Sequence, residues 1–131
     1  MNGDDEPRFL QLATVYRLHA KSLDLFGGLD GVRDAGAVES ALSSGKNAYY
    51  YGDGDVYDVA AAYAFHVAEA QAFLDGNKRT AAACALTFLV GCGVSVPPDG
   101  GQIYAAMIAI ARRELDKVGL AEILRQQFPK P

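Results

Sequence analysis

The sequence predicts an all-α protein with a single domain and about six helices. Apolar residues recur at helical spacing over nearly the whole chain, as in Phe9, Leu12 and Tyr16. The 131 residues are half apolar and about one fifth charged, which is enough apolar material for one core. No internal repeat, low-complexity segment or long linker interrupts the pattern.

The first third of the chain predicts two short helices and an extended segment. An amphipathic helix is expected over residues 9–20, and the eight residues before it are expected to be disordered. After a glycine-rich loop, Asp34 is a plausible N-cap for a short helix that ends at Ser43. Residues 43–55 break the periodicity, so we expect a short extended flap or hairpin there.

Two helices that are apolar on all sides are expected at the centre of the domain. Asp55 can cap the first of them, and residues 80–90 form the second. A polar loop, residues 73–80, joins them. Residues 91–93 end the second helix, an extended segment follows, and two amphipathic helices are expected over residues 101–115 and 118–128. The folded domain is therefore expected to span residues 9–131.

Composition excludes several classes of function. The net charge of −4 and the isoelectric point near 5.0 argue against a domain that binds nucleic acid directly. The sequence predicts neither a membrane-spanning segment nor a signal peptide. Cys84 and Cys92 lie in or near an apolar helix without a metal-ligand spacing, so reduced core thiols in a cytoplasmic protein are expected.

The polar loop has the composition of a phosphate-binding site. A helix N-terminus presents unpaired N–H groups and partial positive charge, and here Lys78 and Arg79 add two cations. Asp75 offers a carboxylate oxygen suited to Mg²⁺. The simpler interpretation is a turn in which Gly76 and Asn77 accept left-handed backbone angles.

The string FLDGNKRTA, from Phe73 to Ala81, resembles the motif of the Fic/Doc family, and its Doc branch in particular. The resemblance extends over residues 9–128 and implies a Fic-type helical bundle that uses ATP and Mg²⁺. It implies that Asp75 holds Mg²⁺ while Asn77 and Arg79 orient and neutralise the phosphates. It also implies that Gly76 lets the backbone approach them, and that Lys78 marks phosphoryl rather than nucleotidyl transfer.

One position departs from the family motif. The family has its catalytic histidine two residues before Phe73, and this chain has Gln71 there. A glutamine amide can position a hydroxyl nucleophile but has no proton equilibrium near neutral pH, and loss of a positioned base costs about 10²–10⁴ in rate. His66 is expected to be a core histidine, His19 a charge near a helix C-terminus, and Phe73 a core residue.

The resemblance also implies partners. The expected flap, Asn47, Ala48, Tyr49 and Tyr50, would hold the target protein as an added strand, although the tyrosines could equally cover the core edge. No serine or threonine has a glutamate four residues later, so the family's inhibitory helix is absent from the sequence. An antitoxin would then supply a helix in trans.

Two functions stay open at this point. The first is a toxin that transfers a phosphoryl or nucleotidyl group from ATP to a hydroxyl of a protein of the translation machinery. The second is an inactive Fic-fold pseudoenzyme that binds nucleotide or an antitoxin.

Overall fold

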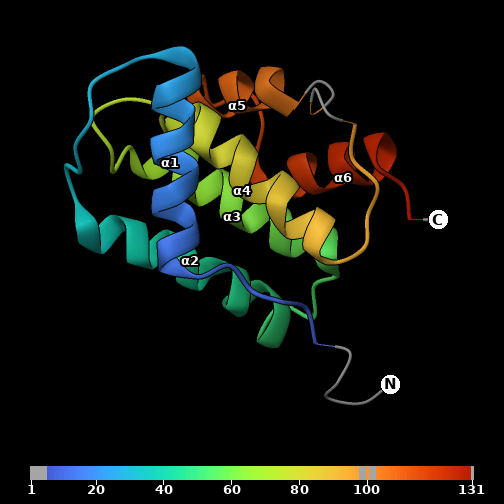
Figure 1. Ribbon diagram of the computed structural model, residues 1–131. Helices are drawn as coiled ribbons and strands as arrows, with labels where there is room; N and C mark the ends of the chain where they lie inside the picture. The colour runs from blue at the N-terminus through green and yellow to red at the C-terminus, as the bar shows by residue number, and fades with distance from the viewer. Residues whose placement is uncertain (1–5, 98–99, 101–102, 131) are drawn as a thin grey trace.

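The computed structural model of the chain describes residues 6–97, 100 and 103–130 (Figure 1). The described residues contain six α-helices, in the order α1 (Leu12–Phe26), α2 (Ala35–Tyr50), α3 (Val56–Ala70), α4 (Asn77–Gly91), α5 (Ile103–Ala111) and α6 (Lys117–Gln127). The only β-type pairing among these residues is an isolated bridge between Val32 and Phe73. The prediction of an all-α bundle is confirmed.

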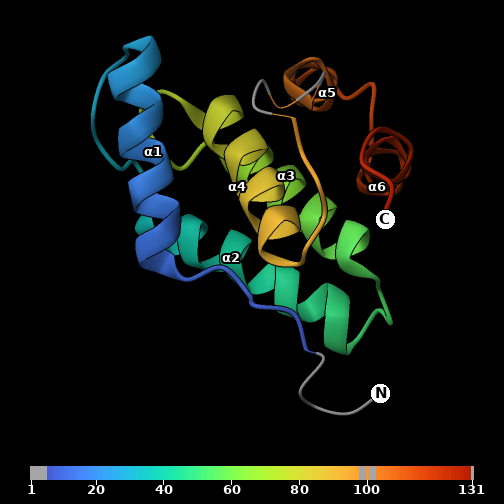
Figure 2. The same ribbon diagram turned by 45° about the vertical axis from the view of Figure 1, so that its right-hand side comes forward.

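The central helix α3 packs against α2, α4, α5 and α6 (Figure 2). Asp55 caps it, as expected, and forms a capping box with Asp58 that satisfies backbone N–H groups at the helix start. Nine of its 15 residues are buried, and seven of the nine are alanine or valine. Small side chains on several faces let four helices approach one axis, so α3 lies in the middle of the core.

The expected extended flap is wrong, because α2 continues to Tyr50 and includes Asn47 and Ala48. Gly45 had marked the end of the periodicity, yet it lies inside the helix and is buried. An added Cβ at Gly45 would lie 2.3 Å from a ring carbon of Tyr63. This glycine therefore permits close packing of α2 on α3 and does not end the helix.

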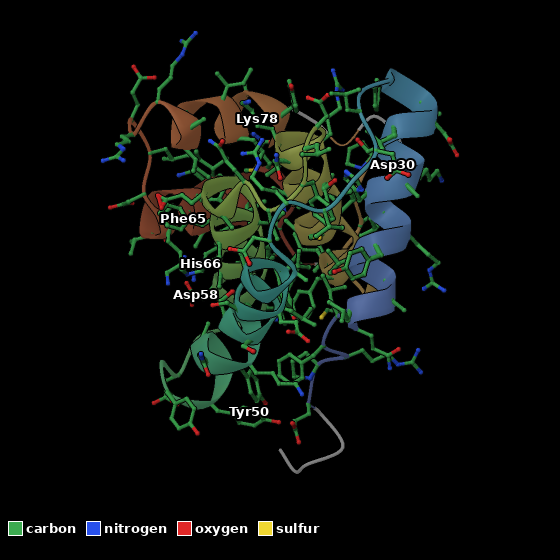
Figure 3. The ribbon with its side chains drawn as sticks, turned by 90° about the vertical axis from the view of Figure 1, so that its left-hand side faces the viewer. Asp30, Tyr50, Asp58, Phe65, His66 and Lys78 are labelled. Atoms are coloured by element: carbon green, nitrogen blue, oxygen red, sulfur yellow. The ribbon has the colours of Figure 1, made fainter. Side chains whose placement is uncertain are left out.

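Tyr49 and Tyr50 cover the edge of the core in the way that the alternative interpretation predicted. Their rings pack against Phe9 at centroid distances of 5.6 and 5.7 Å, and the Tyr50 hydroxyl donates to the Glu6 carboxylate. Tyr50 and Lys78 lie at opposite ends of the molecule (Figure 3). The expected contact of these tyrosines with a target protein stays a prediction.

Other boundaries differ modestly from the predicted ones. The first helix is longer than expected and ends at Phe26, while α5 ends at Ala111, before Arg113 takes a left-handed φ of 61°. Most of the N-terminal segment expected to be disordered, residues 1–5, lies outside the described residues. None of the described helices is long and apolar enough to cross a membrane.

Both cysteines are free thiols, as the sequence predicted. Cys84 lies in α4 and is buried, whereas Cys92, just after α4, is half-buried. Burial raises the pKa of Cys84 to about 12, so this thiol stays protonated at neutral pH.

Candidate phosphate-binding site

The predicted polar loop connects the end of α3 to the start of α4. Gln71 is the C-cap of α3, exposed, with left-handed backbone angles of φ 47° and ψ 44°. The exposed Gln71 thus begins the loop, at the position where the resemblance to the family implies a histidine. A left-handed non-glycine residue costs of the order of 1 kcal/mol or more, which the surrounding contacts must offset.

Backbone pairing fixes the loop against the segment that precedes α2. The Arg33 N–H donates to the Ala72 carbonyl at 2.6 Å, and the Leu74 N–H donates to the Gly31 carbonyl at 3.0 Å. Phe73, between these two bonds, is 1% exposed and confirms its expected place in the core.

The side chain of Asn77 holds the loop from inside. Its Oδ1 accepts from the Phe73 N–H and its Nδ2 donates to the Phe73 carbonyl, both at 3.0 Å. The amide thus uses both of its ends to close the turn. Asn77 therefore sets the start of α4, and its expected role toward a phosphate stays a prediction.

His19 lies beneath the loop, and its expected role as a charge near a helix C-terminus is wrong. Since α1 runs on to Phe26, His19 is mid-helix and 3% exposed. Its ring stacks on Phe73 at a centroid distance of 3.8 Å, and its Nε2 lies 2.8 Å from the Asp75 carbonyl oxygen. A carbonyl can only accept, so Nε2 carries the proton in this contact.

Asp75 is oriented by the glycine-rich loop after α1. The Leu29 N–H donates to Asp75 Oδ2 at 2.8 Å. Gly28, with a φ of 122°, lies so close that an added Cβ would be 3.0 Å from the Asp75 Cβ. Mg²⁺ bound to nucleotide phosphates takes only one or two protein carboxylates, so the single Asp75 carboxylate fits such an ion.

The N-terminus of α4 has no side-chain cap. Its N-cap is Gly76, with a φ of 79°, and no side chain among the described residues makes a cap hydrogen bond there. The unpaired N–H groups of that turn therefore face the same region as Lys78 and Arg79. The guanidinium carbon of Arg79 lies 3.7 Å from the ring centre of Phe26 and 4.5 Å from that of Tyr104.

A cavity of about 300 Å³ brings these groups together. It is lined by Phe26, Gly27, Gly28, Asp75, Gly76, Asn77, Lys78, Arg79 and Tyr104. The predicted site residues from Asp75 to Arg79 all line this cavity, whereas Gln71 does not. The flap residues, Asn47–Tyr50, are not part of it.

Three larger hollows suit an anion less well. One, of about 550 Å³, carries three carboxylates, Glu69, Glu114 and Asp116, around a single Arg113. Another, of about 790 Å³, includes the start of α3, where Asp55 already caps the helix. The third, of about 620 Å³, includes the start of α1 but has one cation, Arg8, and no carboxylate that could hold a metal. None of the three combines an uncapped helix N-terminus with two cations and a carboxylate, so the smaller cavity is the candidate site.

The sequence missed four contributors to this site, namely His19, Phe26, Leu29 and Tyr104. Each reaches the loop from a helix or segment distant along the chain, such as the 56 residues that separate His19 from Asp75. The only sequence signal for that neighbourhood was the paired glycines, Gly27 and Gly28, which indicated a loop but not what it touches.

The fold and the site define a class: an all-α protein whose two central helices meet at a loop where an uncapped helix start lies beside two cations and a carboxylate. Residues 9–89 match the Fic/DOC family, and the chain belongs to that family. It is 31% identical over 122 residues to the protein kinase doc of Escherichia phage P1, a match that covers 92% of this chain and 96% of that protein. It is also 41% identical over 76 residues to the toxin Doc of Mycolicibacterium smegmatis, covering 56% of this chain and 58% of that toxin.

Proposed function

We propose that this chain is a Doc-like toxin of a toxin–antitoxin pair that transfers a phosphoryl group from ATP to a hydroxyl of a translation-related protein. The observation that carries the proposal is the uncapped start of α4, with Lys78, Arg79 and Asp75 around one cavity. In the variant that transfers the nucleotidyl group, the hydroxyl oxygen would form its bond to the α-phosphorus, and pyrophosphate would leave.

The residues present have separate tasks in this reaction. The first turn of α4, with Lys78 and Arg79, would bind and neutralise phosphate oxygens, and Asp75 would hold Mg²⁺. Mg²⁺ held there would supply neutralisation of the phosphate charge. The target hydroxyl oxygen forms a bond to the γ-phosphorus while the bond to the β–γ bridging oxygen breaks, so ADP leaves.

The proton of the attacking hydroxyl has no protein acceptor here. Gln71 cannot take it, and neither histidine replaces the missing base. His19 is buried and donates to the Asp75 carbonyl, while His66, on α3, lies 3.3 Å from the ammonium of Lys117. The proton would pass to water, which a loose phosphoryl-transfer transition state tolerates at a reduced rate.

The cavity at the start of α4 is also compatible with a second function. Without a base, the chain can be a pseudoenzyme that holds nucleotide or an antitoxin without transfer. We expect an antitoxin partner in either case, because the sequence contains no inhibitory motif of its own.

Label transfer tests the proposal directly. ATP labelled at either the α or the γ phosphate is incubated with a cell extract and either the wild-type chain or Gln71→His. Transfer of the γ label by the wild type supports the kinase function, and transfer of the α label indicates nucleotidyl transfer. Transfer by Gln71→His alone assigns the wild-type chain to the pseudoenzymes, and no transfer by either protein contradicts the enzymatic proposal.

Growth tests the toxin assignment separately. Induction of the chain in a host without an antitoxin should arrest growth, and Arg79→Ala should relieve the arrest. Normal growth at confirmed soluble expression of the wild type would contradict the assignment.

A further inference from the structure

We infer that Phe26 and Tyr104 form an aromatic clamp that positions Arg79, so that only the edge of its guanidinium meets a phosphate. The expected effect of this clamp on phosphate binding rests on the proposed function, whereas its geometry does not. The two rings come from α1 and α5, while Arg79 belongs to the first turn of α4. These three helix ends lie together at one end of the molecule (Figures 1 and 2).

The distances place the Arg79 guanidinium over both rings. The 3.7 Å between its guanidinium carbon and the Phe26 ring centre equals the contact distance of two stacked planar groups. All five N–H donors of arginine lie in the guanidinium plane. In a stacked arrangement they point along the Phe26 ring and stay available at the edge, which matches the two-point geometry of a phosphate.

Arg79 has no carboxylate partner within the described part of the chain. The ion pairs there all involve Arg125, on α6. An acidic neighbour can hold an arginine in place, but it would compete with a bound anion. Aromatic faces orient the cation without supplying a competing negative charge.

On the side of Phe26, hydrogen bonds at the end of α1 hold the clamp in place. Phe26 is the last residue of α1, and the Gly27 N–H closes the helix by donating to the Leu23 carbonyl at 2.7 Å. The next residues, Gly28 and Leu29, contact Asp75. A single four-residue segment thus sets both the arginine and the expected metal ligand, which fixes their relative geometry.

Exposure shows that the two rings are not simply core residues. Phe26 is 59% exposed and Tyr104 is 37% exposed, although both contact Arg79 in the cavity lining. An exposed phenylalanine at a helix end gains little from burial, so its contact with Arg79 is the main interaction that the structure assigns to it.

Side-chain NMR of Arg79 tests the clamp without any ligand. In the wild-type chain, the Arg79 Nε–H signal, assigned with Arg79→Lys, should show a ring-current shift and the high order parameter of a rigid group. Phe26→Leu and Tyr104→Leu should each reduce both, while Phe26→Tyr and Tyr104→Phe should retain them. An Arg79 Nε–H equally mobile in the wild type and in both leucine variants would overturn the inference.

Titration calorimetry with Mg²⁺–ATP and with inorganic tripolyphosphate then tests the consequence. We expect each leucine variant to bind about three- to tenfold more weakly than the wild type, with the aromatic swaps unchanged. On an Arg79→Ala background, Phe26→Leu should cause no further loss, because the ring acts through the arginine. Equal losses on both backgrounds would contradict a positioning role.

Tyr51→Leu is the matched control, since Tyr51 is 87% exposed beyond the end of α2 and should change neither readout. The two measurements also separate this inference from the proposed function. An ordered Arg79 that the leucine variants loosen, in a chain that binds neither ligand, supports the clamp and contradicts the function. Wild-type binding that the leucine variants leave intact contradicts the clamp alone.

Discussion

The helices α3 and α4 are consecutive in the chain, but their N-termini differ in how their positive ends are neutralised. At α3, Asp55 and Asp58 cap the helix, and both carboxylates pair with Arg125 at 3.0 and 2.9 Å. At α4, a glycine takes the cap position, and the nearby cations have no acidic partner among the described residues. The first arrangement uses the positive helix end for stability, and the second leaves it available for an anion.

Removal of the cation at α4 should have the largest effect. Arg79→Ala should weaken Mg²⁺–ATP binding about 10- to 100-fold, because a charge-assisted hydrogen bond contributes about 1.5–3 kcal/mol. The melting temperature should change little. Arg125→Ala is the control at α3, and calorimetry should find its nucleotide affinity unaltered. Unchanged affinity in Arg79→Ala would remove the basis for the site.

Removal of the cap at α3 should reduce stability instead. Asp55→Ala loses the cap and a half-exposed ion pair, so we expect the free energy of unfolding to fall by about 1–2 kcal/mol. Urea titration measures this loss, and nucleotide affinity should be preserved. A stability equal to that of the wild type would mean that the two ends do not differ in the way described.

The glycines at the two ends of α4 offer a smaller and sharper contrast. Gly76→Ala places a Cβ at a φ of 79°, with Ser22 Oγ at 3.4 Å, so it should destabilise the chain by about 1 kcal/mol. Gly91→Ala has no heavy atom within 4 Å of the new Cβ and should stabilise the helix by a few tenths of a kcal/mol to about 1 kcal/mol. Urea titration of both variants checks the opposite signs, and a shared sign would contradict the argument.

The opposite end of α3 should give the smallest effect, which depends on pH. Burial lowers the pKa of His66, Lys117 lowers it further, and Glu69 acts in the other direction. The unfolded chain, with a histidine pKa near 6.5, then binds the proton more readily than the folded chain. Stability should therefore decrease as the pH falls below about 6.5.

His66→Gln removes this titration. The wild type should lose more unfolding free energy than His66→Gln between about pH 7.5 and pH 5.5. His19 is the other histidine, and it is unchanged in both proteins. Parallel pH profiles for the two would show that His66 titrates alike in the folded and unfolded chains.

Local sequence patterns predicted the fold class and most of the site. The caps at Asp34 and Asp55 and the two central apolar helices are where the sequence placed them, although α4 begins at Asn77, three residues earlier than expected. These features depend on residues within a few positions of one another, so they can be recognised without knowledge of the rest of the fold. The absence of a catalytic base at Gln71 stays a prediction from the motif.

Long-range packing decided what the sequence left open. Gly45 marked a helix end by its local preference, but its contact with Tyr63 keeps α2 helical. His19, Phe26 and Tyr104 reach the loop only because α1 and α5 pack beside the start of α4. Periodicity reports which face of a helix is apolar, not which partner it meets. The sequence therefore determined the polar, cationic composition of the loop, and the tertiary structure determined which residues orient it.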